Sequence, residues 1–169
     1  IPTGKSSPVL AGKRVFLTAR DGERLLTIAL DRDTGETVWT GEIIRTHVDR
    51  RNELNGGAAG SPATDGNSVY VFFPDFGLAA YSVDGQELWR RRLGPYDSAR
   101  GISTSPLLVE GVIVLMIEQF VDSKVLGVDA ATGKTLWSVP RPTSMGGSYA
   151  TPVAYKAESG EMLAVVTHP

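Results

Sequence analysis

The sequence predicts an all-β fold of repeated four-stranded antiparallel sheets, and three observations support this prediction. First, an eleven-residue phrase occurs three times, as ALDRDTGETVW at 29–39, AAYSVDGQELW at 79–89 and GVDAATGKTLW at 127–137. Second, the three tryptophans that close these phrases lie 50 and 48 residues apart and are the only ones among 169 residues. Third, a Ser-Pro pair opens a strand-like run before each phrase, and a Thr-Pro pair opens a fourth such run at 150–166. A period of this length indicates a repeat architecture.

Each repeat is expected to hold four strands joined by tight turns. In the first repeat the strands are expected near 7–11, 14–19, 25–31 and 36–40, in runs rich in β-branched and aromatic residues. Proline at the second position suits the start of a strand, where no ladder donor is lost. A Thr-Gly or Asp-Gly pair is expected to link the third and fourth strands, because glycine accepts the positive φ of such turns.

Four strands in every repeat of this length form one blade of a β-propeller. The expected blades occupy about 6–43, 60–93 and 104–140, and a half blade occupies 150–169. The whole chain, 1–169, is therefore a single partial propeller of about three and a half blades, which cannot close a ring alone. We expect either a fragment, since the first residue is Ile and not Met, or a homo-oligomer in which two chains complete one ring.

The residues that recur in the phrase are expected to have structural roles. The tryptophans should pack between adjacent sheets, where a large ring buries the most area. The small residue that opens each phrase (Ala29, Ala79 or Gly127) should let neighbouring sheets approach closely, and the aspartates should cap their own turns. The residues assigned to this structural motif are Ala29, Asp31, Gly35, Trp39, Gly85, Trp89, Asp129, Gly133 and Trp137.

The phrase A-x-D-x-x-T-G-x-x-x-W resembles the tryptophan-docking motif of PQQ-type, or quinoprotein-like, propellers. The first copy fits at every fixed position, the third differs only at Gly127, and the second differs at Tyr81 and Asp84. The runs SPATDGNSVYVFF, GLAAYSVDGQELWRRRLG and SYATPVAY are similar to the BamB-like branch, named after the propeller subunit of the machinery that assembles outer-membrane β-barrels. The resemblance implies a bacterial periplasmic or cell-envelope scaffold that binds protein or peptide.

Composition excludes several classes of function. A net charge of −2 gives no electrostatic case for binding nucleic acid or an anionic membrane. The absence of cysteine excludes disulfides and thiolate metal sites, and two histidines are too few for a histidine-based metal cluster. No run approaches the roughly 18 apolar residues of a spanning helix. The run DRDTGE (31–36) is similar to the start of a calcium loop, but the other copies lack its second acid, with Val83 and Ala131 there, so a turn explains all three.

Candidate binding residues lie in the loops that share one face of a propeller, because such loops vary while the blades hold them rigidly. Arg51, Arg100 and Arg141 fall in equivalent connections, so they are expected either to converge near the axis and bind an acidic group or to pair with acids such as Asp97 or Glu53. Of these two, pairing of the arginines with acids is favoured. For the longest loop, at 41–60, an ordinary solvated loop is the alternative to a polar binding surface. The candidate partner-binding residues are Arg45, His47, Arg51, Asn55, Tyr96, Arg100, Arg141 and Tyr149.

Three functions are compatible with these observations. The first is a non-catalytic scaffold, for which one route is addition of a partner strand at an exposed blade edge. The second is a fragment of a PQQ-dependent, quinoprotein-like oxidoreductase whose cofactor site lies in missing blades. The third is a carbohydrate-binding propeller that uses Phe76, Tyr96 and Tyr149. We favour the scaffold and assign no catalytic, cofactor-binding or metal-binding residue, since the repeat motif carries fold and not activity.

Overall fold

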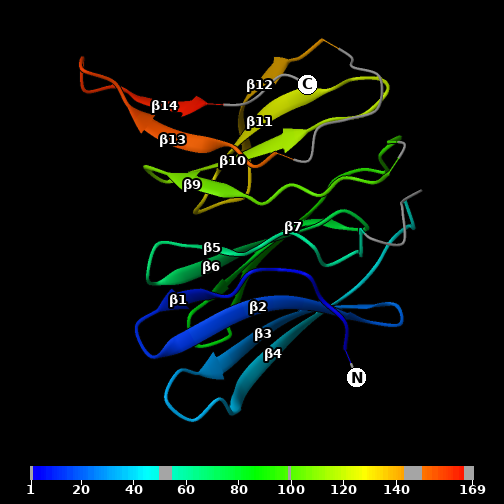
Figure 1. Ribbon diagram of the computed structural model, residues 1–169, viewed down its shortest axis with the longest axis vertical. Helices are drawn as coiled ribbons and strands as arrows, with labels where there is room; N and C mark the ends of the chain where they lie inside the picture. The colour runs from blue at the N-terminus through cyan, green and yellow to red at the C-terminus, as the bar shows by residue number, and fades with distance from the viewer. Residues whose placement is uncertain (1, 50–54, 99, 143–149, 166–169) are drawn as a thin grey trace.

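The computed structural model describes residues 2–49, 55–98, 100–142 and 150–165, and it confirms the all-β prediction. Three four-stranded antiparallel sheets, here called blades 1, 2 and 3, follow one another with their strands in sequence order (Figure 1). Blade 1 contains β1 (Val9–Ala11), β2 (Arg14–Asp21), β3 (Arg24–Asp31) and β4 (Thr37–Ile44). Blade 2 contains β5 (Ala63–Thr64), β6 (Ser68–Phe73), β7 (Gly77–Ser82) and β8 (Glu87–Arg92). Blade 3 contains β9 (Leu107–Val109), β10 (Val112–Ile117), β11 (Lys124–Asp129) and β12 (Thr135–Pro140), and the half blade contains β13 (Val153–Lys156) and β14 (Met162–Val165).

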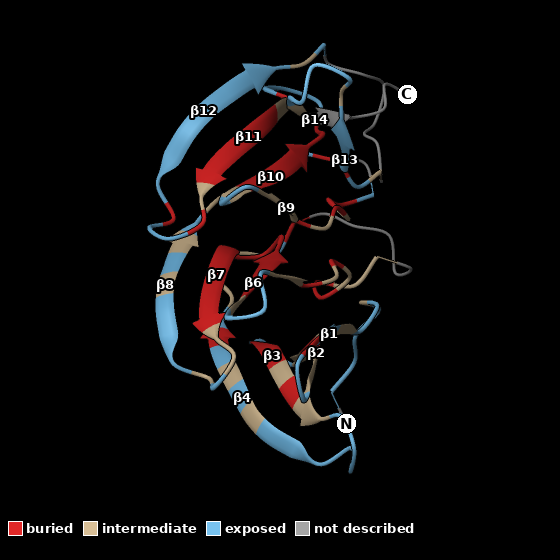
Figure 2. Ribbon diagram, turned by 90° about the vertical axis from the view of Figure 1, so that its left-hand side faces the viewer, coloured by how far each residue is buried: buried red, intermediate tan, exposed pale blue. Residues whose placement is uncertain are grey.

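The blades form an open arc and not a closed ring. Blade 1 and the half blade lie at opposite ends of the arc (Figure 1). The last strands of the complete blades, β4, β8 and β12, line one side of the arc and are largely exposed, whereas β6, β7, β10 and β11 are buried (Figure 2). The strand β4 extends to Ile44, beyond the end expected near residue 40, because its ladder continues to the pair Arg24–Ile44.

The core lies between neighbouring blades. Along β6, Val69, Val71 and Phe73 belong to the hydrophobic cluster between blades 1 and 2. The alternate residues Tyr70 and Phe72 belong to the cluster between blades 2 and 3. Successive side chains of a strand point to opposite faces, so a strand covered on both faces must be apolar at every position. This explains why β6 has a continuous apolar run and not an alternating one.

The closing tryptophans contact the following blade. The indole nitrogen of Trp39 donates a 2.9 Å hydrogen bond to the carbonyl oxygen of Val83 in blade 2. Trp89 makes the same 2.9 Å bond to the carbonyl oxygen of Ala130 in blade 3. The ring of Trp39 also covers Gly85, where a Cβ atom would lie 2.8 Å from the Cγ atom of the indole. Glycine is therefore required here both by its φ of +95° and by the approach of the ring.

The register of blade 2 corrects the alignment of the second phrase. In blades 1 and 3 the residue that opens the phrase pairs with the closing tryptophan. In blade 2 the partner of Trp89 is Ala80, so Ala80 and not Ala79 is the equivalent small residue. In blades 1 and 3 the amide of the turn glycine donates to the carbonyl oxygen of the aspartate, and in blade 2 the amide of Gly85 donates to that of Ser82. Ser82, and not Tyr81, is therefore equivalent to the aspartate. The turn of blade 2 is one residue shorter than its counterparts.

The Ser-Pro and Thr-Pro pairs link consecutive blades as well as starting strands. The backbone amide of Ser7 donates to the hydroxyl oxygen of Ser61 at 2.9 Å, and the amide of Ser61 donates to that of Ser105 at 2.9 Å. The amide of Ser105 donates to the hydroxyl oxygen of Thr151 at 3.2 Å. One hydroxyl in blade 2, one in blade 3 and one at the start of the half blade therefore each accept a hydrogen bond from the preceding blade.

Candidate functional site on the loop face

The β4–β5, β8–β9 and β12–β13 connections lie on the same face as the β2–β3, β6–β7 and β10–β11 connections, because consecutive strands run in opposite directions. We call this face the loop face. Its described residues include most of the candidate partner-binding residues. Arg51 and Tyr149 lie outside the described residues.

A buried polar network joins three of these loops. Asp49 is only 5% exposed. Its carboxylate accepts a 3.0 Å hydrogen bond from the backbone amide of Tyr96. The amide of Asp49 donates in turn to a carboxylate oxygen of Asp75, a fully buried residue, at 3.2 Å. The Nε2 atom of His47 lies 3.0 Å from the carbonyl oxygen of Pro74, and a carbonyl only accepts, so Nε2 carries a proton. These contacts hold the loops against one another.

Arg141 forms an ion pair with Glu118, which directly follows β10. The side chain of Glu118 is 1% exposed and that of Arg141 is 10% exposed, so the pair is withdrawn from water. The backbone amide of Arg141 also donates to the carbonyl oxygen of Ser123 at 2.8 Å. The sequence had suggested Asp97 or Glu53 as typical acidic partners, whereas the partner in the structure is an acid that the sequence did not single out.

Two further candidate residues also have partners within the chain. The guanidinium of Arg45 donates to a carboxylate oxygen of Glu23 at 3.0 Å. The side-chain amide of Asn55 donates to the backbone carbonyl oxygen of Arg100 at 2.9 Å and so joins two loops. Arg100 itself is exposed. Of the three arginines expected near the axis, only Arg100 and Arg141 are described, and Arg141 contacts Glu118 and Ser123 of blade 3.

Two buried acids, Asp75 and Glu118, were missed by reasoning from the sequence. Each follows a run of apolar strand residues closely: Asp75 after VYVFFP and Glu118 after VIVLMI. A charged residue at the end of a buried strand is rarely fully buried without a partner. This position in the sequence is therefore the signal that identifies both residues as parts of an internal polar network.

The aspartates of the repeated phrase accept hydrogen bonds from their own turns. One carboxylate oxygen of Asp31 accepts from the amide of Asp33 at 2.9 Å and from that of Thr34 at 3.0 Å. One carboxylate oxygen of Asp129 accepts from the amide of Thr132 at 2.7 Å and from its hydroxyl at 2.8 Å. These bonds lower the pKa of both carboxyl groups, chiefly through Thr34 and Thr132 respectively. The carboxylate of Asp31, which resembles a calcium ligand in sequence, thus serves the turn.

The donor set needed for a metal-dependent quinone cofactor is not found in the part of the chain that the structure describes. No three His, Cys, Asp or Glu side chains gather there in a group that could hold a metal ion. The sequence also contains no cysteine. The described residues therefore do not fit calcium with PQQ, and we assign no chemical step to them. Among the same residues, no helix has the length and apolar content to cross a membrane.

Comparison with known families identifies the class to which this propeller belongs. The profile of the family described as outer membrane protein assembly factor BamB matches residues 50–148, which is more than half of the chain. The chain therefore belongs to the BamB family. A comparison with curated proteins gave no significant match.

Solved structures share the same fold. BamB from Moraxella catarrhalis is 20% identical, with a TM-score of 0.54 over 97% of this chain and 50% of its own. A europium-containing methanol dehydrogenase is 16% identical, with a TM-score of 0.64 over 83% of this chain and 25% of its own. Quinohemoprotein alcohol dehydrogenase from Comamonas testosteroni is 22% identical, with a TM-score of 0.62 over 82% of this chain and 21% of its own. The chain spans half or less of each of these proteins, which include both enzymes and BamB.

Proposed function

We propose that the chain is part of a non-catalytic scaffold that binds an extended segment of a partner protein in the bacterial periplasm or cell envelope. Membership in a family described by outer membrane protein assembly supports both a protein partner and this location. The quinoprotein-like oxidoreductase takes second place, because no described residues supply a donor set to which its chemistry can be assigned. The observation that carries the proposal is the free edge of β8.

The strand β8 is the last strand of blade 2, and within the described part of the chain it pairs only with β7. The amide of Leu93 donates to the carbonyl oxygen of Phe76, so Leu93, Arg91 and Trp89 direct their backbone polar groups toward β7. Arg90 and Arg92 therefore direct theirs away from the sheet. Such unpaired groups are a template for another strand.

The neighbouring edge on β12 is less suited to strand addition. The amide of Arg141 donates to the carbonyl oxygen of Ser123, so the backbone of Pro140 faces outward by the same alternation. Proline has no amide hydrogen and so removes one donor from that edge. No proline interrupts Glu87–Arg92, and β8 keeps its outward donors.

The charge of the β8 edge indicates the chemistry of the partner segment. Arg90 and Arg92 stand against one acid, Glu87, with which Arg90 is paired, whereas the guanidinium of Arg91 donates to Gly133 in blade 3. The apolar side chain of Leu88 is 45% exposed beside them. A basic edge with an exposed apolar residue favours an extended segment that alternates acidic and apolar side chains.

The test uses a synthetic peptide of about eight residues that alternates valine and glutamate, with binding followed by fluorescence anisotropy. Arg90→Pro removes the outward donor while leaving the β7–β8 ladder intact, and it should weaken binding by at least about tenfold. Arg90→Ala keeps the donor and removes only the charge, so it should weaken binding less and reduce the salt dependence. Circular dichroism checks that both variants fold. Equal binding by the proline variant and the parent would overturn the proposal.

We also propose that copies of the chain associate through the open ends of the arc. Trp137 of blade 3, the last complete blade, is 38% exposed, and at the blade 1 end of the arc the turn glycine Gly35 has no described residue within 4 Å of an added Cβ. Between neighbouring blades in the interior of the arc, the closing tryptophan of one blade covers the turn glycine of the next, as Trp39 covers Gly85. Light scattering over a concentration series tests this: a stable dimer is expected, and a monomer at micromolar concentration overturns it.

A further inference from the structure

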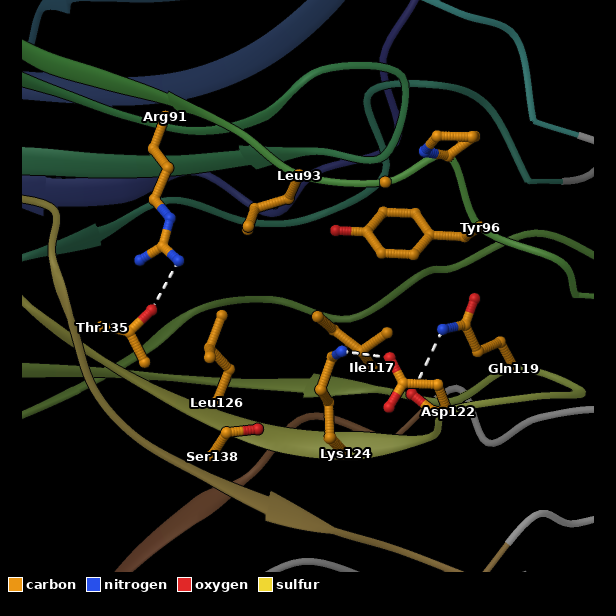
Figure 3. Close-up of a pocket in the computed structure, with 12 residues that line it drawn as sticks. Arg91, Leu93, Tyr96, Ile117, Gln119, Asp122, Lys124, Leu126, Thr135 and Ser138 are labelled. Atoms are coloured by element: carbon orange, nitrogen blue, oxygen red, sulfur yellow. Dashed lines mark hydrogen bonds and ion pairs between the residues drawn. The ribbon is translucent and has the colours of Figure 1, made fainter.

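A pocket of about 390 Å³ lies between blades 2 and 3, away from the outward edge of β8. One wall is formed by the end of β8 and the segment that follows it, and the other by β10, β11 and β12 (Figure 3). Its volume falls within the range of pockets that bind small molecules, about 300 to 1,000 Å³. The apolar side chains of Leu93, Ile117 and Leu126 line it.

The hydroxyl group of Tyr96 is buried beside this pocket without a hydrogen-bond partner among the described residues. The residue is 7% exposed, and its hydroxyl points toward the space bordered by Leu93 and Arg91 (Figure 3). Burial raises the pKa of Tyr96 far above its usual value, so the group is a neutral donor at physiological pH. A buried donor without an acceptor is the exception in folded proteins and calls for an explanation.

The charged groups around the pocket are already held in place. The guanidinium of Arg91 donates to the carbonyl oxygen of Gly133 at 2.9 Å and also to the hydroxyl of Thr135. A guanidinium has five N–H donors, so others remain for a ligand. Besides burial, the carboxylate of Asp49 raises the pKa of Tyr96, and the charge of Arg91 lowers it by less. Arg91 and Tyr96 both line this pocket. At the other end, Lys124 pairs with Asp122.

We propose that this pocket binds a small carboxylic acid with a short apolar body. The carboxylate accepts hydrogen bonds from the Tyr96 hydroxyl and the Arg91 guanidinium, and the apolar body lies on Leu93, Ile117 and Leu126. Two cations and one acid give the pocket a net positive charge, which favours an anion over a neutral ligand. This site is independent of strand addition at β8 and remains if that proposal fails.

The experiment titrates the full chain with 4-methylpentanoate and, separately, with its neutral isostere 4-methylpentanamide, following backbone amides by heteronuclear NMR. A dissociation constant of about 1 mM is expected for the acid, given its few heavy atoms, and at least about tenfold weaker binding for the amide. The shifts should centre on residues of the pocket. Equal affinity for the two compounds, or no shift of pocket amides at about 20 mM acid, overturns the proposal.

Two tyrosine variants provide the matched control. Tyr96→Phe removes only the unpartnered hydroxyl, so the chain should stay folded while affinity for the acid falls by about tenfold. Tyr81→Phe removes another buried hydroxyl, from the cluster between blades 1 and 2, and should leave the affinity unchanged. An unchanged affinity in Tyr96→Phe, or an equal loss in both variants, contradicts a role for Tyr96 in binding.

Discussion

The indole nitrogen of Trp39 in blade 1 donates a 2.9 Å hydrogen bond to the carbonyl oxygen of Val83 in blade 2. Trp89 makes an equal bond to Ala130 in blade 3. Val83 and Ala130 occupy equivalent places, since each follows the residue whose carbonyl oxygen accepts the amide of the turn glycine. The tryptophan of blades 1 and 2 therefore fixes where the turn of the next blade packs against it. Repeating the phrase repeats this contact, and the sheets are thereby placed side by side in an arc.

Trp89→Phe should lower the free energy of unfolding by about 2 kcal/mol, because it removes part of a packed ring and leaves the carbonyl oxygen of Ala130 without its donor. Trp137→Phe is the matched control. Its ring is 38% exposed, and no contact with a following turn is described, so a loss below about 1 kcal/mol is expected. Urea unfolding measures both losses. Equal losses would show that contact with the next blade contributes nothing.

Gly133→Ala should destabilise the chain more than Gly35→Ala, although both glycines occupy the same turn position. Their φ values, +72° and +74°, are nearly equal, so the backbone cost of an alanine is about the same, roughly 1 kcal/mol. At Gly133 the added Cβ also lies 2.7 Å from the ring of Trp89, whereas at Gly35 no described atom lies within 4 Å. An extra loss of about 1–2 kcal/mol is expected from this overlap. Thermal or urea unfolding that gave identical values would refute the steric argument.

Much of the fold could be predicted because its signals are local. Runs of β-branched and aromatic residues, glycine turns and the repeat period mark the strands and the blades without reference to any contact. The second phrase shows where local reading fails. Its spacing from glycine to Trp89 matches the other copies, but its turn is one residue shorter, so counting from the start assigned Ala79 and Tyr81 in place of Ala80 and Ser82.

The loop-face contacts were less predictable because they join residues far apart in the sequence. Arg141 was identified as a candidate, but its partner Glu118 lies in another loop of the same blade, and only the folded sheet brings them together. The hydrogen bond from the amide of Ser7 to the hydroxyl of Ser61 likewise forms only when blades 1 and 2 pack side by side. The residue type of Arg141 predicted an ion pair, and the Ser-Pro pair at Ser7 predicted the start of a strand. Neither prediction could name the residue that each one contacts.

Asp129 should contribute stability that depends on pH. Hydrogen bonds from Thr132 hold its pKa below the usual value, near 3.9 in an unfolded chain, so the ionised form stabilises the fold above about pH 4. That contribution is lost as the pH falls through the folded-state pKa. Asp129→Asn should therefore reduce the decrease in stability between about pH 5 and pH 2, as measured by urea unfolding at several pH values.

Blade 2 supplies the control for this prediction. Ser82 stands at the position of the aspartate and accepts a 3.1 Å hydrogen bond from the amide of Gln86, but it does not ionise in this range. Ser82→Ala should change stability by the same amount at every pH. If Asp129→Asn shows the same acid dependence as the parent chain, then the turn carboxylate is not a source of it.

The ion pair between Glu118 and Arg141 should be among the contacts most sensitive to substitution. Glu118→Gln leaves the guanidinium of Arg141 facing a neutral group in a site where its side chain is only 10% exposed, and a loss of about 3 kcal/mol is expected. Adding Arg141→Met should cost less than in the parent chain, because the buried charge that Glu118 no longer balances is then gone. Urea unfolding of the two single variants and the double variant measures this coupling. The exposed pair Glu87–Arg90 is the control, and Glu87→Gln should cost less than about 1 kcal/mol. Additive losses at positions 118 and 141 would show that the buried charges do not depend on each other.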